Sequence, residues 1–374
     1  MRSRIAVIGS GPAGLAFARV LHRHDHPVTV LERDPSRDAR PPGGTLDLQE
    51  GLGQRALEKA GVLAEFRELS RPEGQAMRIL DTDGTVLRDW QPRPDERANP
   101  EIDRGQLRDL LLGPLDVQWG REVTEVVPGG GDGALVRFAD GRQETFDLVV
   151  GADGAWSRVR PALSPVTPQY TGVTYVETSL DDIDTCHPDL ARLVGDGSVA
   201  VYGVNRSIVA QRNSGGHVKV YAQFRTEEDR SPQGAAGTDA DAVRSGLLAL
   251  FEGWAPPVLD LLRHGTSFVR RPLYTLPASH TWAHVSGVTL LGDAAHLMPP
   301  LGAGANLAML EGAELAESIA SSGPGDLDET VRAFEERMWT RAGRWASITI
   351  AGLERLVSPD PSAALALFDD VQPS

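Results

Sequence analysis

A glycine-rich turn near the N-terminus constrains the fold of this chain more than any other feature. The apolar run Ile5-Ala-Val-Ile8 has the composition of a buried strand, and Gly9-Ser-Gly11-Pro-Ala-Gly14 follows it directly. Apolar residues then recur at helical spacing as far as His22, and a second apolar run begins at Val28 and ends at Leu31. This order predicts two parallel strands joined by a crossover helix, the unit from which dinucleotide-binding sheets are built.

The glycine spacing predicts a phosphate site at this turn. Gly9 permits the tight turn, Gly11 lets the backbone approach a pyrophosphate, and Gly14 lets the helix pack close to the sheet. The helix N-terminus then faces the phosphates with unpaired N–H groups. Glu32 ends the second strand, where a carboxylate can accept hydrogen bonds from an adenosine ribose. The cofactor-binding residues expected here are Gly9, Gly11, Pro12, Ala13, Gly14, Glu32 and Arg33.

Charge and cysteine usage exclude several classes of function. The chain has 37 Lys and Arg against 52 Asp and Glu, a formal net charge of −15, so its surface should repel nucleic acid and anionic membranes. Its apolar runs are much shorter than the ~20 residues that span a bilayer, and we expect a cytoplasmic protein. Cys186 is the only cysteine, which excludes an intramolecular disulfide and a cysteine metal cluster. His22, His24 and His26 alternate without the ligand set of a metal site, and no metal is expected.

Two further motifs place carboxylates at strand ends. The sequence Val149-Val-Gly-Ala-Asp153-Gly154 predicts a strand that runs into an Asp-Gly turn, followed by a helix. Another buried strand ends at Leu291-Gly292-Asp293, and the loop Pro299-Pro-Leu-Gly-Ala-Gly-Ala-Asn306 leads into a long amphipathic helix. A proline-braced loop and a glycine-rich helix start fit a second anionic or polar section of the same ligand.

In this order and at these separations, the three motifs resemble those of the FAD-dependent aromatic hydroxylases over nearly the whole chain. The resemblance implies that the three N-terminal glycines flank the FAD pyrophosphate. It also implies that Glu32 binds the adenosine ribose and that Asp293 binds the ribityl chain. Asp153-Gly154 would support both FAD and the pyridine nucleotide.

A narrower resemblance, to the tetracycline-inactivating flavin monooxygenases, rests on three segments. These are Gly43-Gly-Thr-Leu-Asp-Leu48, the stretch Asn99-Pro-Glu-Ile102 with Arg104, and Gly292-Asp-Ala-Ala-His-Leu-Met-Pro-Pro300. A Gln and an Arg hold tetracycline in those enzymes, and the matching positions here are Glu177 and Val199. The resemblance implies further cofactor contacts, from Arg40 to NADPH and from Asp47, Arg104, Pro300, Gly302, Gly304 and Asn306 to FAD.

The resemblance and the strand and helix patterns together predict an α/β fold. A Rossmann-like FAD-binding domain, similar to that of para-hydroxybenzoate hydroxylase, should carry a β-sheet substrate domain and a closing C-terminal helix. Apolar periodicity predicts helices over 54–69, 239–263, 306–320 and 326–355. The expected FAD-binding domain comprises 1–72, 102–161 and 281–323, the substrate domain 73–101 and 162–280, and the C-terminal helix and tail 324–374.

The activity implied by the resemblance is oxygen insertion. NADPH would reduce FAD, O2 would add at the flavin C4a, and the hydroperoxide would deliver one oxygen to an electron-rich phenol or enol, tetracycline-like or another polyketide. A general base would keep the substrate hydroxyl partly deprotonated. The sequence leaves its identity open, with Glu177, His217, Arg212 and Arg225 as candidates on the inferred substrate sheet. We expect a compact monomer.

Other functions stay open at this level. The same scaffold supports flavin-dependent reduction and halogenation, although the Trp-x-Trp-x-Ile-Pro string of tryptophan-type halogenases does not occur in the sequence. A non-catalytic nucleotide-binding protein, or a plain NAD-dependent dehydrogenase built on the first motif, belongs to a different class. A dehydrogenase does not explain Asp293 and the glycine-rich loop that follows it.

Overall fold

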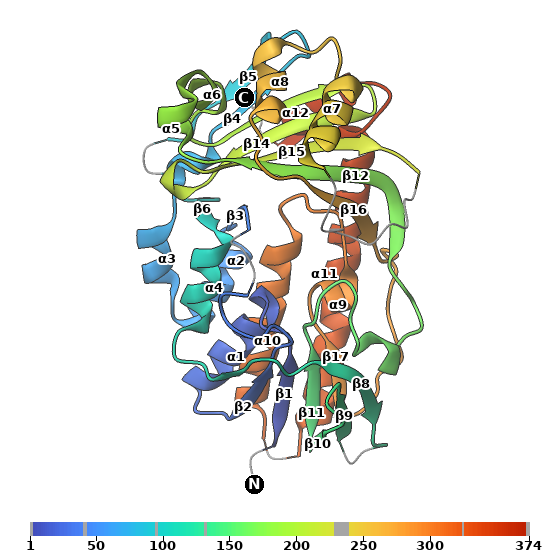
Figure 1. Cartoon of the computed structure of the whole chain (residues 1–374). Helices are drawn as coiled ribbons and strands as arrows, with labels where there is room; N and C mark the ends of the chain where they lie inside the picture. The colour runs from blue at the N-terminus through green and yellow to red at the C-terminus, as the bar shows by residue number, and fades with distance from the viewer. Residues whose placement is uncertain are drawn as a thin grey trace.

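The computed structural model describes residues 3–39, 43–93, 96–130, 133–227, 239–323 and 325–371. A parallel sheet with flanking helices lies at the N-terminal end of the molecule, and a larger, mostly antiparallel sheet crosses the opposite end (Figure 1). The long helix α11 (Leu327–Leu356) runs from one part to the other. The molecule therefore has two separate sheets, and the residues between them are where a shared site would lie.

The parallel sheet contains the predicted strand–helix–strand unit. Its order is β17-β11-β1-β2-β7, and every neighbouring pair is parallel. Helix α1 packs on α10, where a Cβ at Gly312 would lie 2.4 Å from the Ala13 carbonyl oxygen, so this contact requires glycine. The elements are β1 (Ile5–Ile8), α1 (Pro12–Arg23), β2 (Val28–Leu31), β7 (Val117–Gln118), β11 (Leu148–Gly151), β17 (Val288–Leu290), α9 (Asp293–His296) and α10 (Gly304–Ser321).

Smaller elements surround this sheet. A two-stranded ribbon, β3-β6, lies on the side toward the larger sheet, and an antiparallel sheet, β10-β9-β8, lies at the other end (Figure 1). Their bounds are β3 (Thr45–Asp47), α2 (Gly53–Ala60), α3 (Leu63–Leu69), η1 (Pro72–Gln75), β6 (Glu101–Asp103), α4 (Arg104–Leu112), β8 (Val123–Pro128), β9 (Ala134–Phe138), β10 (Gln143–Phe146) and η2 (Arg160–Ala162).

The larger sheet has seven strands in the order β16-β12-β15-β14-β13-β4-β5. Its outer face packs on helices α5 to α8 through an apolar cluster that includes Val199, Ile208 and Phe251. The bounds are β4 (Met77–Leu80), β5 (Val86–Trp90), β12 (Gln169–Leu180), α5 (Ile183–Cys186), α6 (Pro188–Val194), β13 (Ser198–Gly203), β14 (Arg206–Arg212), η3 (Ser214–Gly216), β15 (Val218–Arg225), α7 (Ala240–Leu250), α8 (Pro256–Arg263) and β16 (Val269–Thr275).

The C-terminal segment covers part of the inner face of this sheet. Helix α12 (Ser362–Val371) places Phe368 against Trp90 and Tyr202, with ring centroids 6.2 and 5.8 Å apart. The Arg225 guanidinium donates to the Val357 carbonyl oxygen (2.7 Å) and so anchors the end of α11 to β15. The part of the inner face on β12, β15 and β16 is left to face the parallel-sheet half.

Helix α11 is also fixed to the parallel sheet by a buried acid. Glu335 accepts hydrogen bonds from Trp282 Nε1 (3.1 Å), Thr289 Oγ1 (2.8 Å) and His284 Nδ1 (2.7 Å). The other ring nitrogen of His284 lies 3.1 Å from Asp328. Burial alone would lower the pKa of His284, but its bonds to Glu335 and Asp328 outweigh burial and raise the pKa.

Four sequence expectations were wrong in detail. The expected helix 54–69 is two helices, since Gly61 adopts a left-handed conformation (φ +72°) that ends α2. The expected helix 239–263 is divided before Pro256, which begins α8. The helix expected after Asp153-Gly154 is only the short turn η2, because Gly154 (φ +81°) redirects the chain. The expected C-terminal tail contains α12.

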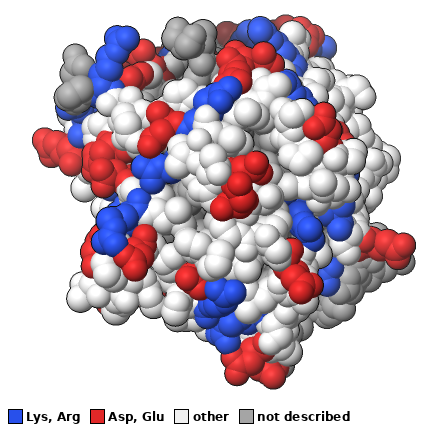
Figure 2. Space-filling model, turned by 90° about the horizontal axis from the view of Figure 1, so that it is seen from above, with Lys and Arg blue, Asp and Glu red and all other residues white. Residues whose placement is uncertain are grey.

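Charges of both signs are mixed on the surface at one end of the molecule. Figure 2 views the end formed by the seven-stranded sheet and its helices, and acidic and basic side chains are interspersed over it. The described residues of this face form no broad surface of one sign. Among the described residues, no helix combines the length and apolar character needed to cross a bilayer.

Candidate active site

The glycine turn between β1 and α1 has the geometry that its sequence predicts. A Cβ at Gly9 (φ +103°) would lie 2.4 Å from the Ala152 carbonyl oxygen, and a Cβ at Gly14 would lie 2.1 Å from the Gly9 carbonyl oxygen. Both positions therefore require glycine for packing. Gly11 differs, because a Cβ there would meet nothing within 4 Å. The backbone at Gly11 is open to a ligand, directly before Pro12 and Ala13 begin α1.

Glu32 is held beside this turn by its neighbours. One carboxylate oxygen accepts from the Ser10 backbone N–H (2.8 Å) and from Ser10 Oγ (2.7 Å), and the other accepts from the Asp34 N–H (3.0 Å). The side chain is buried, whereas Arg33 is exposed. Ser10 fixes the orientation of the acid, a role that the glycine pattern did not reveal.

Asp153 and Asp293 come together through a buried arginine. The Arg160 guanidinium donates to the backbone carbonyl oxygens of Ala155 (2.8 Å), Asp293 (3.1 Å) and Ala294 (2.8 Å). It thereby joins the Asp-Gly turn to the strand end at Asp293. Sequence reasoning missed Arg160, since nothing distinguishes it there from a surface arginine.

The carboxylates of Asp153 and Asp293 can still accept hydrogen bonds from a ligand. Asp153 Oδ2 accepts from the Arg158 N–H (2.6 Å), but its Oδ1 is buried without a partner, and burial raises the pKa of the group. Asp293 remains accessible to solvent although the surrounding protein raises its pKa by desolvation. A solvent-accessible carboxylate with protein around it can accept hydrogen bonds from a bound ligand.

Asn306 ties the loop before α10 to the β3 segment. Its Oδ1 accepts from the N–H groups of Gln49 (2.9 Å) and Gly53 (3.1 Å), and its Nδ2 donates to the carbonyl oxygens of Asp47 (2.8 Å) and Gly302 (2.8 Å). Because the amide spends its capacity within the protein, Asn306 is a positioning residue. It fixes the loop that begins at the exposed Pro300 and ends at Gly304, the first residue of α10.

Asp47 and Arg104 lie where the two sheets face each other. Burial raises the pKa of Asp47 to about 6, although the hydrogen bond with Gln49 and the positive charge of Arg104 both lower it. Arg104 begins α4, and its charge also acts on Tyr175 and Tyr221 of the larger sheet. This arginine is thus close to both halves of the molecule.

The inner face of the larger sheet carries a polar cluster at Glu177. Its two oxygens accept from Lys219 Nζ (2.9 Å) and Arg271 Nε (2.8 Å). Burial alone would raise the pKa of Glu177, but these two hydrogen bonds lower it. Tyr221 lies opposite Glu177 in the strand register. A Cβ at Gly44 would lie 2.5 Å from the Tyr221 hydroxyl, so the cluster faces the β3 segment.

The other sequence candidates do not join Glu177. The Arg212 guanidinium pairs with Asp184 of α5, and His217 Nδ1 lies 2.5 Å from Asp181. Both side chains are thus engaged at the end of the sheet next to α5, which does not support a role as the base. Val199 points into the outer-face core, so it does not pair with Glu177 across a site. Arg40 lies outside the described residues.

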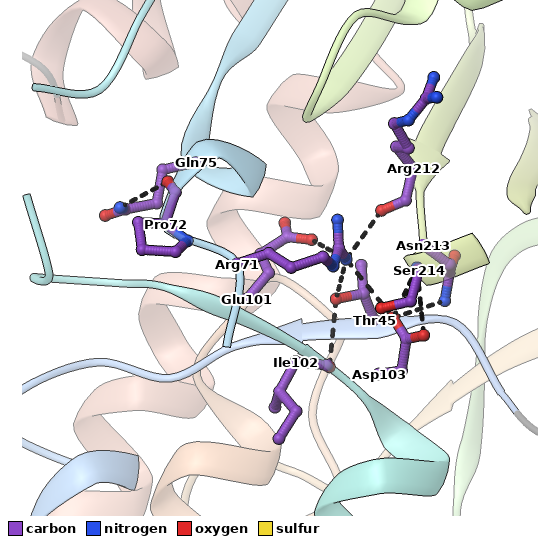
Figure 3. A network of polar contacts seen from close by, with 10 residues as sticks. All are labelled: Thr45, Arg71, Pro72, Gln75, Glu101, Ile102, Asp103, Arg212, Asn213 and Ser214. Atoms are coloured by element: carbon purple, nitrogen blue, oxygen red, sulfur yellow. Dashed lines mark hydrogen bonds and ion pairs between the residues drawn. The ribbon is translucent and has the colours of Figure 1, made fainter. Parts of the chain in front are cut away.

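A polar network joins the halves beside the site (Figure 3). The Arg71 guanidinium donates to Thr45 Oγ1 (3.2 Å), Asp103 Oδ1 (3.4 Å) and the Arg212 carbonyl oxygen (3.0 Å). Its nearest approach to Glu101 is 3.6 Å, and burial raises the pKa of Glu101 to about 7. Arg71, which the sequence did not single out, links the β3-β6 ribbon to the end of β14.

These residues fit FAD. The open backbone at Gly11 suits a pyrophosphate, and the unpaired buried oxygen of Asp153 and the accessible Asp293 offer acceptors to hydroxyl groups. Glu32 directly follows β2, where a ribose would lie. Gly302 (φ +83°) places backbone beside Asp47, where a Cβ would lie 3.5 Å from the carboxylate.

Comparison with known proteins agrees with this geometry. Residues 2–331 match the FAD binding domain family. The chain is 32% identical over 408 residues to a protein named Monooxygenase penA from Penicillium thymicola, covering 92% of this chain and 93% of that protein. The structure of Klebsiella pneumoniae HpxO complexed with FAD and uric acid has a TM-score of 0.80 and 21% identity, covering 98% of this chain and 92% of that chain. The tetracycline destructase Tet(51) has a TM-score of 0.74 and 20% identity, covering 99% and 96%.

The fold and the site define the class as an FAD-binding flavoprotein with the para-hydroxybenzoate hydroxylase-like architecture. This chain belongs to the FAD binding domain family and is an FAD-dependent monooxygenase of the class A type. The predictions of fold class, cofactor FAD and enzyme class are confirmed.

Proposed function

We propose that this monooxygenase hydroxylates an electron-rich phenolic or enolic molecule, with NADPH and O2 as co-substrates. One oxygen atom enters a carbon–hydrogen bond of the substrate and the other leaves as water, while NADPH supplies the hydride, solvent supplies one proton, and NADP⁺ is released. The proposal rests chiefly on one observation: the polar inner face at Tyr175, Glu177 and Tyr221 lies toward the β3 segment that carries Asp47. Substrate and cofactor surfaces thus meet.

The chain's own residues bind and orient the cofactor and the substrate. When bound, FAD supplies electron transfer and oxygen activation, and the protein supplies position and electrostatics. Gly11, Glu32, Asp153 and Asp293 would hold the cofactor, with Arg104 near its inner end. Helix α12 closes one side of the substrate face with Phe368 and Leu365, which excludes water from that side.

Two tyrosines and one acid are placed to handle the substrate hydroxyl. Tyr175 and Tyr221 pack edge to face, with centroids 5.5 Å apart, and burial raises the pKa of both, so they stay protonated hydrogen-bond donors. Glu177 stays ionised and can accept a hydrogen bond from the substrate. Such contacts favour a partly deprotonated hydroxyl, which makes the adjacent ring carbon a better nucleophile.

A surface cavity of about 440 Å³ supports the use of a nicotinamide nucleotide. Its lining includes Arg33, Trp156 and Arg158, and the Trp156 side chain is 53% exposed. An exposed indole offers a stacking surface for a base, and the guanidinium groups suit phosphates. The cavity begins next to Glu32 and the Asp-Gly turn, the motif associated with the pyridine nucleotide.

We propose a tetracycline-like or other polyketide phenol as the substrate, because this fold is similar to that of a tetracycline-inactivating enzyme. Tet(51) is named as a tetracycline destructase, and its fold covers nearly all of this chain. Because Val199 is buried in the outer core, the tetracycline contacts of those enzymes are not reproduced at that position. We further propose a monomer in the cytoplasm.

The test is turnover by the purified yellow protein. Aerobic NADPH consumption would be followed with tetracyclines and with other polyketide phenols, and products would be read by mass. We expect faster NADPH oxidation with one phenol class and a product one oxygen heavier. Reduction of a double bond or chlorination would instead identify a reductase or halogenase. Failure of NADPH and NADH to reduce the flavin with any substrate would favour a non-catalytic protein.

A further inference from the structure

We propose that the substrate carries a negative charge, which Lys219 and Arg271 recognise, and that Glu177 neutralises part of the positive charge of these two cations. The inference rests on the proposed function, since it concerns the molecule that this face binds. Its basis is the cluster Lys219–Glu177–Arg271, drawn from the three neighbouring strands β15, β12 and β16.

The cluster has more positive charge than its acid can neutralise. Glu177 gives one oxygen to Lys219 Nζ (2.9 Å) and the other to Arg271 Nε (2.8 Å). One carboxylate between two cations leaves a net positive charge. The ammonium group keeps two further donors, and the guanidinium keeps its terminal nitrogens, which have no acidic partner among the described residues.

Burial makes this charge effective. The side chains of Lys219 and Glu177 are 13% and 15% exposed, whereas that of Arg271 is 49% exposed. Lys219 and Glu177 are therefore shielded from solvent, and the more exposed Arg271 contacts Glu177 from the solvent side. A charged hydrogen bond in such surroundings is stronger than one on an open surface.

The groups around the cluster also favour an anion. Tyr175 and Tyr221 flank Glu177 as protonated hydroxyl donors, and Arg104 approaches from the other half of the molecule. Asp47 is the acid on that opposite side, and the positive charge of Arg104 acts on it. An ionised carboxyl or enol oxygen would thus meet donors on both sides. The fold alone does not require this charge, because related folds accept different ligands.

The proposal predicts opposite effects from two neighbouring substitutions. Arg271→Gln removes a cation and should weaken binding of an anion by about tenfold, the usual effect of losing a hydrogen bond to a charged group. Glu177→Gln removes the competing negative charge, keeps the side-chain shape and should strengthen binding of the same anion. A purely structural role for the cluster would weaken binding in both variants.

The experiment uses FAD-loaded enzyme and two probes of similar shape. These are 2,4-dihydroxybenzoate, an anion, and resorcinol, its neutral counterpart, each titrated by the change in flavin absorbance. We expect tighter binding of the anion by about tenfold, a loss of that preference in Arg271→Gln, and a larger preference in Glu177→Gln. Arg192→Gln, at an exposed side chain of helix α6, is the matched charge control and should bind both probes like the parent.

Three results would overturn the proposal: equal binding of the two probes, binding of neither, or weaker anion binding in both cluster variants. Circular dichroism and FAD content verify that each variant is folded. The titration needs no turnover, so it separates this inference from the proposed reaction. Anion preference without NADPH-dependent oxygenation would refute the reaction and keep the charged site.

Discussion

Asn306 joins two loops of the cofactor site, so replacing its amide by a carboxylate tests the described geometry sharply. In Asn306→Asp, the oxygen that accepts from Gln49 and Gly53 is retained. The new second oxygen faces the carbonyl oxygens of Asp47 and Gly302, which Nδ2 approached at 2.8 Å. Two hydrogen bonds are lost and two carbonyl groups are left opposite an acceptor.

The expected cost follows from these contacts. Each lost hydrogen bond contributes about 1 kcal/mol, and leaving buried groups unpaired costs roughly 1–3 kcal/mol more. The side chain is fully buried, so solvent cannot replace the lost partners. We therefore expect the free energy of unfolding to fall by about 3–5 kcal/mol. FAD content should fall as well, because the Gly302 loop and the Asp47 segment are no longer joined.

The assay is urea unfolding of the FAD-free and FAD-loaded proteins, with FAD content measured by absorbance. Asn99→Asp is the matched control, since Asn99 is exposed and its change should stay within about 0.5 kcal/mol. A loss below about 1 kcal/mol in Asn306→Asp, with normal FAD content, would refute the reasoning about these four bonds.

Two further predictions concern the glycine turn and the partly buried His284. Gly11→Ala should leave the stability of the FAD-free protein near that of the parent and weaken FAD binding at least about tenfold. Gly14→Ala should instead destabilise the fold itself. Calorimetry of the FAD-free protein and FAD titration distinguish the two effects. The folded pKa of His284 is raised, so its contribution to stability is complete below the unfolded pKa of about 6.5 and is lost as pH rises through the folded pKa. Thermal unfolding from mildly acidic to alkaline pH should show this loss, and His284→Gln should remove it. An unchanged pH profile in that variant would contradict the assignment.

The parts of the fold that a sequence pattern specifies were predictable. The strand–helix–strand unit follows from local periodicity, and Gly9 and Gly14 are required by backbone contacts as close as 2.1 Å. The ends of helices were less predictable. Gly61 ends α2 because it adopts φ +72°, a preference that acts at one residue and leaves the apolar spacing on both sides intact.

The cofactor half of the site was easier to predict than the substrate half. Glu177 was identified through resemblance, but Lys219 and Arg271 come from other strands and meet it only through the pairing of β15 and β16 with β12. Arg160 binds carbonyl groups, which have no signature in a sequence. Long-range partners of this kind are set by register and topology, which local periodicity does not encode.

The central claim is that this protein inserts one atom of molecular oxygen into its substrate. The most direct measurement supplies dioxygen labelled with the heavy isotope to the yellow enzyme, NADPH and the phenol that most accelerates NADPH oxidation, and then weighs the product. The account predicts one labelled oxygen atom in each product molecule, with the second recovered in water. A product whose added oxygen comes from unlabelled water, or a product without added oxygen, would contradict it.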